Sequence, residues 1–209
     1  MDKIDKIISK QEQDKMTPES VLKDLIEGNK RFIENKFEYR DYSSQKISAT
    51  EGQYPKAIVL SCVDSRVPVE TIFDQGIGDI FVSRVAGNFV NTDILGSMEY
   101  ACKVAGSKLV FVLGHEKCGA VSSACDHVEL GNITSMLKNI KPAIEDTSTE
   151  GERSSKNAEF VQAVVEKNVQ LNIERIRKES PILKDLEDFG EIKIVGGVYS
   201  LKTGKIKML

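Results

Sequence analysis

Short apolar runs alternate with amphipathic segments along most of this chain. Three runs, 57–60, 80–82 and 109–113, are rich in β-branched or aromatic residues and are apolar at consecutive positions. Such runs predict strands that are buried on both faces, as in a parallel sheet between layers of helices. Between them, residues 69–75 and 93–105 predict helices, which gives the order βαβαβ. The simplest fold with this order is an α/β fold with a mostly parallel central sheet covered by helices.

The N-terminal part of the chain predicts an amphipathic helix. Thr17 can cap a helix, and Pro18 is tolerated at its first position. Apolar residues then recur at helical spacing to about residue 36: Val21, Leu22, Leu25, Ile26, Phe32 and Ile33. This apolar face must be covered, either by the chain's own domain or by a second copy of the chain.

The second half of the chain continues the pattern. Residues 120–128 predict a helix, and the polar residues 145–157 predict an exposed loop. A longer amphipathic helix is expected from residue 160 toward 178. Residues 192–199 then predict a final strand at an edge of the sheet.

Composition narrows the classes of function. A length of 209 residues suits one domain with a sizeable core. The formal net charge of −3, with lysines spread among acidic residues, argues against a nucleic-acid partner. Nowhere do 18 apolar residues run together, so we expect no membrane association. We therefore expect a cytoplasmic protein, with a periplasmic one as the alternative if a signal peptide preceded this sequence.

Two thiols and one imidazole form a candidate catalytic zinc site. Cys62 lies in the segment SCVDSRV, and His115 and Cys118 lie in GHEKCGA. A structural zinc normally takes four protein ligands, whereas three ligands leave a position for water or substrate. Cys62 follows the first predicted strand, and the other two residues follow the third. Because ligands gather at the carboxyl ends of parallel strands, we expect the three side chains to converge.

Asp64 and Arg66 lie close to the first of these ligands in the sequence. Asp64 could serve as a fourth zinc ligand in a closed state of the site. Alternatively, a charge-assisted bond to Arg66 draws it away, and it accepts a hydrogen bond from zinc-bound water. A purely structural ion pair is the third interpretation. The remaining cysteines, Cys102 and Cys125, are expected to be reduced packing residues.

CVDSRV followed by HEKCGA resembles the signature of the β-class carbonic anhydrases. The resemblance continues in IGDIFVSRVAGN, SMEYA and IVGGVYSLKTG, and covers roughly residues 50–204. Val63 and Val85 depart from the residues usual in the family, but neither is a ligand. The resemblance implies one domain over residues 1–209, with an N-terminal helical arm (1–45) and a zinc-binding α/β core (50–204).

The resemblance also implies a reaction and an assembly. The reaction is the reversible hydration of CO2 to bicarbonate and a proton, by attack of zinc-bound hydroxide on CO2, with one Zn2+ per chain. The assembly is a homodimer or a dimer of dimers, with the N-terminal helices extending to pack on the partner. A COS or CS2 hydrolase on the same scaffold and a non-catalytic zinc-binding protein are the alternatives.

Substrate-pocket residues follow from the same resemblance. Gln53, Phe81 and Tyr100 match the glutamine, phenylalanine and tyrosine that line the CO2 pocket in plant-type members, where Gln53 would lie close to the partner's site. Gly119 would let the backbone approach a small ligand closely. Val59 stands where members inhibited by bicarbonate carry a tryptophan, and the chain contains no Trp. The plant-type pocket is therefore the better match.

Overall fold

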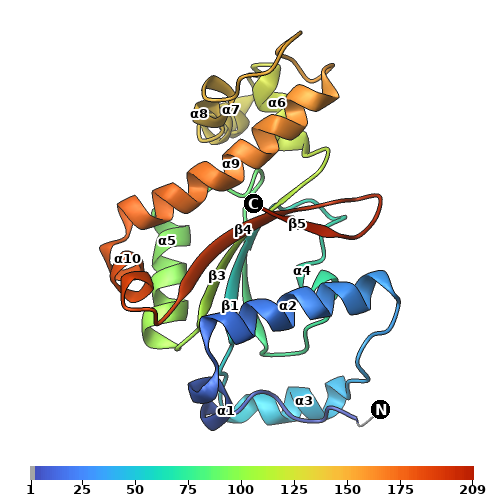
Figure 1. Ribbon diagram of the computed structural model, residues 1–209, viewed down its shortest axis with the longest axis vertical. Coiled ribbons are helices and arrows are strands. Elements are labelled where there is room, and N and C mark those ends of the chain that lie inside the picture. The colour runs from blue at the N-terminus through green and yellow to red at the C-terminus, as the bar shows by residue number, and fades with distance from the viewer. Residues whose placement is uncertain (1–2) are drawn as a thin grey trace.

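A five-stranded sheet forms the centre of the protein (Figure 1), as described by a computed structural model of residues 3–209. The strand order is β2-β1-β3-β4-β5. The first four strands are parallel, and the last is antiparallel to its neighbour. The strands are β1 (Ala57–Ser61), β2 (Ile80–Arg84), β3 (Leu109–His115), β4 (Lys193–Tyr199) and β5 (Ile206–Met208). The predicted α/β fold with a mostly parallel sheet is confirmed.

Helices cover both faces of this sheet (Figure 1). The first group precedes β2 in the chain and comprises α1 (Lys10–Lys15), α2 (Pro18–Ile33), α3 (Tyr42–Ser48), the 3-10 turn η1 (Ala49–Glu51) and α4 (Val69–Ile72). The second group follows β2 and comprises α5 (Thr92–Glu99), the π-helix η2 (Tyr100–Val104), α6 (Gly119–Cys125), α7 (Gly131–Leu137), α8 (Lys141–Glu145), α9 (Ala158–Glu179) and α10 (Pro181–Asp188). α2 and α4 pack on one face, whereas α5, α9 and α10 pack on the other.

The alternation of side chains along each strand divides the core into two clusters. Ile58 and Leu60 of β1 point to the side of α9, whereas Ala57 and Val59 point to the side of α2. Successive residues of a strand face opposite sides of the sheet, so a strand with helices on both sides must be apolar at every position. This is why the continuous apolar runs predicted β1 and β3 correctly.

Two predictions about the edges of the sheet are wrong. Residues 192–199 do not form an edge strand, because β5 pairs with the outer side of β4 in the register Gly197 with Met208. β2 is an edge strand instead, and its residues are only half-buried or exposed, not buried on both faces. The sheet therefore has one short antiparallel edge and one parallel edge at β2.

Much of the apolar face of α2 packs on the chain's own core. Thr17 caps the helix by accepting a hydrogen bond from the Ser20 amide, at 3.2 Å. Val21 and Leu25 are 1% and 0% exposed, and both belong to the cluster around Phe73 of this same chain. Ile33, the last residue of the helix, is 38% exposed, so the cover is incomplete there. Partner contact by the N-terminal helices stays a prediction.

Ion pairs also hold the N-terminal arm on its own chain. The buried carboxylate of Asp74, which follows α4, accepts hydrogen bonds from the guanidinium groups of Arg31 and Arg40. Glu38 pairs with both arginines as well. Removing one partner of such a buried ion pair lowers the stability of the fold, because the remaining buried charge then has no opposite charge beside it.

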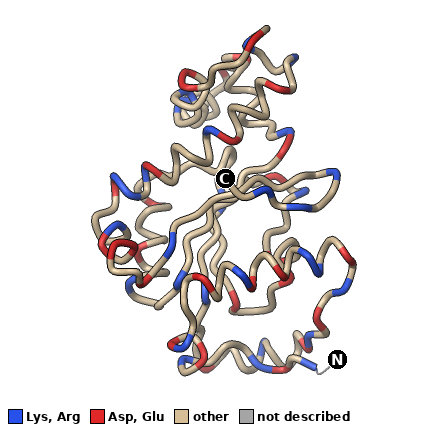
Figure 2. The backbone as a smooth tube through the Cα atoms, viewed as in Figure 1, with Lys and Arg blue, Asp and Glu red and all other residues tan. Residues whose placement is uncertain are grey.

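Charged residues lie mainly on the outer elements. Lysine and arginine alternate with acidic residues along the outer helices, while the central strands carry few charges (Figure 2). Within residues 3–209, no helix is both long and apolar enough to cross a membrane.

Leu25→Ala tests whether α2 belongs to the core of its own chain. Removing a fully buried leucine leaves a cavity, so we expect the free energy of unfolding to fall by about 2–5 kcal/mol. Lys23→Ala on the exposed side of the same helix should change it by less than about 0.5 kcal/mol. Denaturant unfolding measures both. Equal, small effects would contradict the assignment of this helix to the core.

Candidate metal centre

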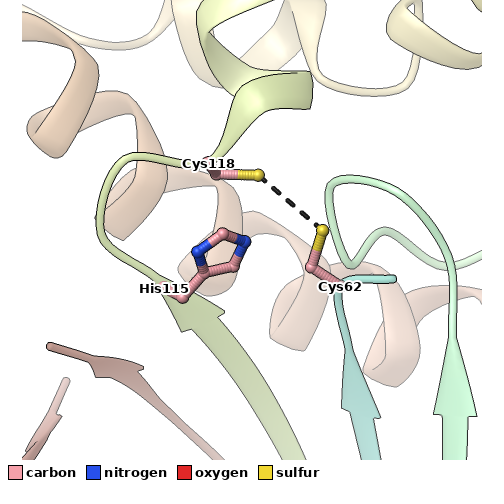
Figure 3. A group of neighbouring side chains, drawn as sticks. All are labelled: Cys62, His115 and Cys118. Atoms are coloured by element: carbon pink, nitrogen blue, oxygen red, sulfur yellow. Dashed lines mark hydrogen bonds between the residues drawn. The ribbon is translucent and has the colours of Figure 1, made fainter. Parts of the chain in front are cut away.

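Cys62, His115 and Cys118 converge at the carboxyl end of the sheet (Figure 3). β1 and β3 are paired in parallel with Ser61 opposite Leu113, so β1 ends two residues before β3 and both strands end at the same edge of the sheet. Cys62 directly follows β1, and His115 is the last residue of β3. All three ligand atoms lie within 4.8 Å of one another. The predicted convergence of the three residues is confirmed.

A tight turn brings Cys118 back over His115. Lys117 adopts a φ of 52°, in the left-handed region, and reverses the chain between the two ligands. Cys118 is the residue before the first turn of α6. A glycine is required at position 114, because a Cβ there would lie 2.7 Å from Val169 Cγ2 of α9. At Gly119 a Cβ would meet no heavy atom within 4 Å, so packing does not explain this glycine.

The ring of His115 is prepared to bind a metal through Nε2. Its Nδ1 lies 2.9 Å from the carbonyl oxygen of Glu116, and because a carbonyl can only accept, Nδ1 carries the proton. Nε2 then has a free lone pair. This atom is buried and has no hydrogen-bond partner within residues 3–209. A buried nitrogen without a partner is costly, and a metal ion would satisfy it.

The two sulfur atoms are spaced for a shared ion. Cys62 Sγ and Cys118 Sγ are 3.9 Å apart, far beyond a disulfide bond. Two thiolates at about 2.3 Å from one tetrahedral zinc would lie about 3.8 Å apart. Two thiolates, one imidazole and this spacing fit Zn2+.

A hydrogen bond between the two sulfur atoms shifts the pKa values of the two thiols in opposite directions. The hydrogen bond from Cys118 lowers the pKa of Cys62 far below its ordinary value, whereas the same bond and burial raise the pKa of Cys118. The Gly87 amide also donates to Cys62 Sγ, at 3.4 Å. A metal ion bound here would hold both sulfur atoms as thiolates.

Asp64 stands beside this triad and is held by Arg66. The Arg66 Nε and Nη2 atoms donate to the two carboxylate oxygens, at 2.9 and 2.7 Å, and the Arg66 amide donates to Oδ1. This bidentate pair holds the pKa of Asp64 well below its usual range. Asp64 Oδ2 is 3.9 Å from His115 Nε2, too far for a hydrogen bond. The carboxylate is therefore ionised, bound to Arg66 and adjacent to the ligand atoms.

Arg84 is a site residue that the sequence analysis missed. It lies at the end of β2, and its guanidinium donates to the carbonyl oxygens of Cys62 and Asp64, at 2.9 and 2.7 Å. These two bonds fix the backbone that carries the first ligand and the carboxylate. One signal was present in the sequence: Arg84 stands in SRVAGN, at the end of a predicted strand. An arginine there can reach the backbone carbonyls at the end of the neighbouring strand.

The predicted substrate-pocket residues lie apart from the ligands within one chain. Phe81 and Tyr100 meet edge to face, with ring centroids 6.2 Å apart, and line a cavity of about 620 Å³ beside β2. None of the three ligands lines this cavity. Gln53 is exposed and precedes β1, so it lies at the opposite end of that strand from Cys62.

Comparison with known proteins agrees with this geometry. The sequence model of the family described as carbonic anhydrase matches residues 57–206. "Carbonic anhydrase 2" of Mycobacterium tuberculosis is 34% identical over 192 residues, which cover 90% of this chain and 91% of that protein. The chain belongs to the carbonic anhydrase family. It is therefore an enzyme of that family.

This carbonic anhydrase shares its fold with solved β-carbonic anhydrases. The β-carbonic anhydrase CcaA superposes with a TM-score of 0.70 and 24% identity, covering 90% of this chain and 94% of that one. A structure of two tetrameric β-carbonic anhydrases from Sordaria macrospora gives a TM-score of 0.68 and 24% identity, over 78% and 85%. At this identity the likeness concerns the fold, which is that of the β class.

The other two cysteines lie outside the cluster. Cys102 and Cys125 are free and buried. Burial raises the pKa of Cys102 to about 12, so this thiol stays protonated at neutral pH. The expectation that they are reduced packing residues agrees with this environment.

The metal assignment predicts the effect of removing single ligands. His115→Ala or Cys118→Ala leaves two ligands, so we expect zinc content to fall from one per chain to a small fraction of that. Cys102→Ala removes a buried thiol outside the cluster and should keep the full zinc content. Elemental analysis of the purified variants measures this. Full occupancy after loss of either ligand would contradict the assignment.

Proposed function

We propose that this carbonic anhydrase catalyses the zinc-dependent reversible hydration of CO2 to bicarbonate and a proton. The observation that carries the proposal is a buried set of two thiols and one imidazole that faces an ionised carboxylate, where a structural zinc site would have a fourth cysteine or histidine. When bound, zinc would lower the pKa of a water molecule to near neutrality and so supply the nucleophile for CO2.

The proposed role of Asp64 is to orient that water. Its Oδ2 is the carboxylate oxygen nearest to His115 Nε2, and its side chain is 16% exposed, so it reaches the site without being sealed from solvent. Because Arg66 keeps it ionised, Asp64 can only accept a hydrogen bond from the water. A water whose hydrogen points at Asp64 would keep an oxygen lone pair for attack on the substrate.

The proposed role of Arg66 is to keep the fourth zinc position open. Its guanidinium holds both oxygens of Asp64 and also donates to the carbonyl oxygen of Lys117, at 3.3 Å. It therefore bridges the two loops that carry the ligands. If Arg66 released Asp64, its carboxylate, with Oδ2 3.9 Å from His115 Nε2, would be free to bind the metal itself.

Asp64→Asn and Arg66→Ala separate these two roles. Asp64→Asn keeps the size of the side chain but changes the hydrogen bond that it offers, so zinc should stay bound while CO2 hydration falls by about 10²-fold. Arg66→Ala should lower the rate similarly by freeing Asp64 to occupy the metal. Stopped-flow hydration assays on zinc-quantified protein measure both rates.

Anion binding distinguishes the two variants. An anion that coordinates zinc should bind Asp64→Asn as it binds the parent, but should bind Arg66→Ala poorly at neutral pH, because the carboxylate competes for the metal. If both variants bind the anion normally and keep full hydration activity, Asp64 and Arg66 are only a structural ion pair.

We further propose that two chains together complete each site, in a homodimer or a dimer of dimers. Phe81 and Tyr100 line a cavity that none of the three metal-binding residues lines. Gln53 lies at the end of β1 opposite to Cys62. If these residues line the CO2 pocket, as in plant-type members, a second chain must bring them to the metal. The half-exposed edge strand β2, beside that cavity, supports such a contact. The solved structures from Sordaria macrospora, which are tetrameric, are consistent with it.

Complementation tests this assembly. Gln53→Ala and Cys118→Ala should each lose activity, but their mixed dimer contains one intact site, made from the zinc ligands of one chain and the glutamine of the other. Co-expression in equal amounts should restore about one quarter of parent activity, because half of the dimers are mixed. Cys118→Ala mixed with His115→Ala should restore nothing. An active monomer in light scattering, or full activity of Gln53→Ala alone, would contradict the shared site.

A further inference from the structure

A backbone amide outside the ligand loops contacts one of the ligands. Gly87, in the loop after β2, donates its amide hydrogen to Cys62 Sγ at 3.4 Å. Gly87 has a φ of 85°, and a Cβ there would lie 2.6 Å from Ile140 Cδ1. The loop is therefore tightly enclosed at this residue, and its position decides whether the amide reaches the sulfur.

Two asparagines of α9 hold this loop. The Asn168 Nδ2 atom donates to the Gly87 carbonyl at 2.9 Å, and the Val90 amide donates to Asn172 Oδ1 at 2.8 Å. Asn172 Nδ2 in turn donates to Asn168 Oδ1 at 3.2 Å and to its backbone carbonyl at 2.8 Å. The two side chains thus connect the helix to both ends of the segment 87–90.

These asparagines lie where the helix is otherwise apolar. Both are 2% exposed, and the neighbouring buried positions of α9 are Val165, Val169 and Ile176. A buried amide costs free energy unless its polar atoms are satisfied, so two of them at an i, i+4 spacing require specific partners. Their partners are the backbone groups of the loop and each other. The network is therefore directed at the loop that contacts Cys62.

We infer that Asn168 and Asn172 are positioning residues for the metal ligand Cys62. They fix Gly87 so that its amide donates to the sulfur, and this hydrogen bond draws electron density from the thiolate that binds the ion. The inference rests on the zinc site proposed above. Neither asparagine touches the metal or the substrate in this arrangement; both act through Gly87.

Cobalt substitution gives a readout that does not depend on activity. In the Co2+ protein, loss of the Gly87 hydrogen bond raises the energy of the sulfur lone pair, so the sulfur-to-cobalt charge-transfer band should move to longer wavelength. Asn168→Leu has a similar shape and no donor, and it should show this shift. It should also lose Co2+ to excess EDTA about 10-fold faster or more, as expected when a group that supports a ligand is removed.

Two further variants keep the test decisive. Asn172→Asp keeps the acceptor for the Val90 amide but loses the donor to Asn168, so it should give a smaller shift in the same direction; it carries the test if Asn168→Leu does not fold. Ile176→Val, one turn further along α9, lowers stability without touching the loop and should leave both the spectrum and the EDTA rate at parent values.

The outcomes separate this inference from the zinc assignment. Parent-like spectra and EDTA rates in both asparagine variants, with Co2+ bound to the parent, would overturn the positioning role and leave the metal site intact. The same changes in Ile176→Val would also overturn it, since they would then reflect stability alone. Failure of the parent itself to bind Co2+ would contradict the metal site and the inference together.

Discussion

The site depends on the parallel register of β1 and β3. With Ser61 opposite Leu113, β1 ends two residues before β3 at the same edge of the sheet, and residues far apart in the sequence become neighbours. A shift of one residue would turn the alternating side chains of β1 to the wrong faces, which both core clusters forbid. The packing that stabilises the sheet therefore also fixes the positions from which Cys62 and His115 project.

Hydrogen bonds from outside the ligand set then adjust each member of the site. The Glu116 carbonyl selects the tautomer of His115, and Arg84 fixes the backbone on both sides of residue 63. Arg66 keeps Asp64 ionised and away from the ligand atoms. Each of these partners is a charged or backbone group that fixes the orientation of one site residue. Such fixed orientations suit a site in which three residues bind the metal and a fourth position stays open.

The sequence predicted what depends on residue type and local pattern: the buried strands β1 and β3, the convergence of the three candidate ligands, and the Asp64–Arg66 pair. It could not predict what depends on tertiary pairing. β5 contains only Ile206 and Met208 as apolar residues around a lysine, so nothing marked it as the cover for β4. The half-exposed β2 reads like a buried strand until its neighbours are known. Asn168 carries no local signal of its role, because its partner, the Gly87 carbonyl, lies far away in the sequence.

The most direct test is a zinc titration of the metal-free protein, followed by CO2 hydration. Three buried ligands with one open position predict that activity rises linearly with added zinc and stops rising at one zinc per chain. Fully loaded protein that leaves CO2 hydration at the uncatalysed rate would contradict the account, because the ion would then be structural.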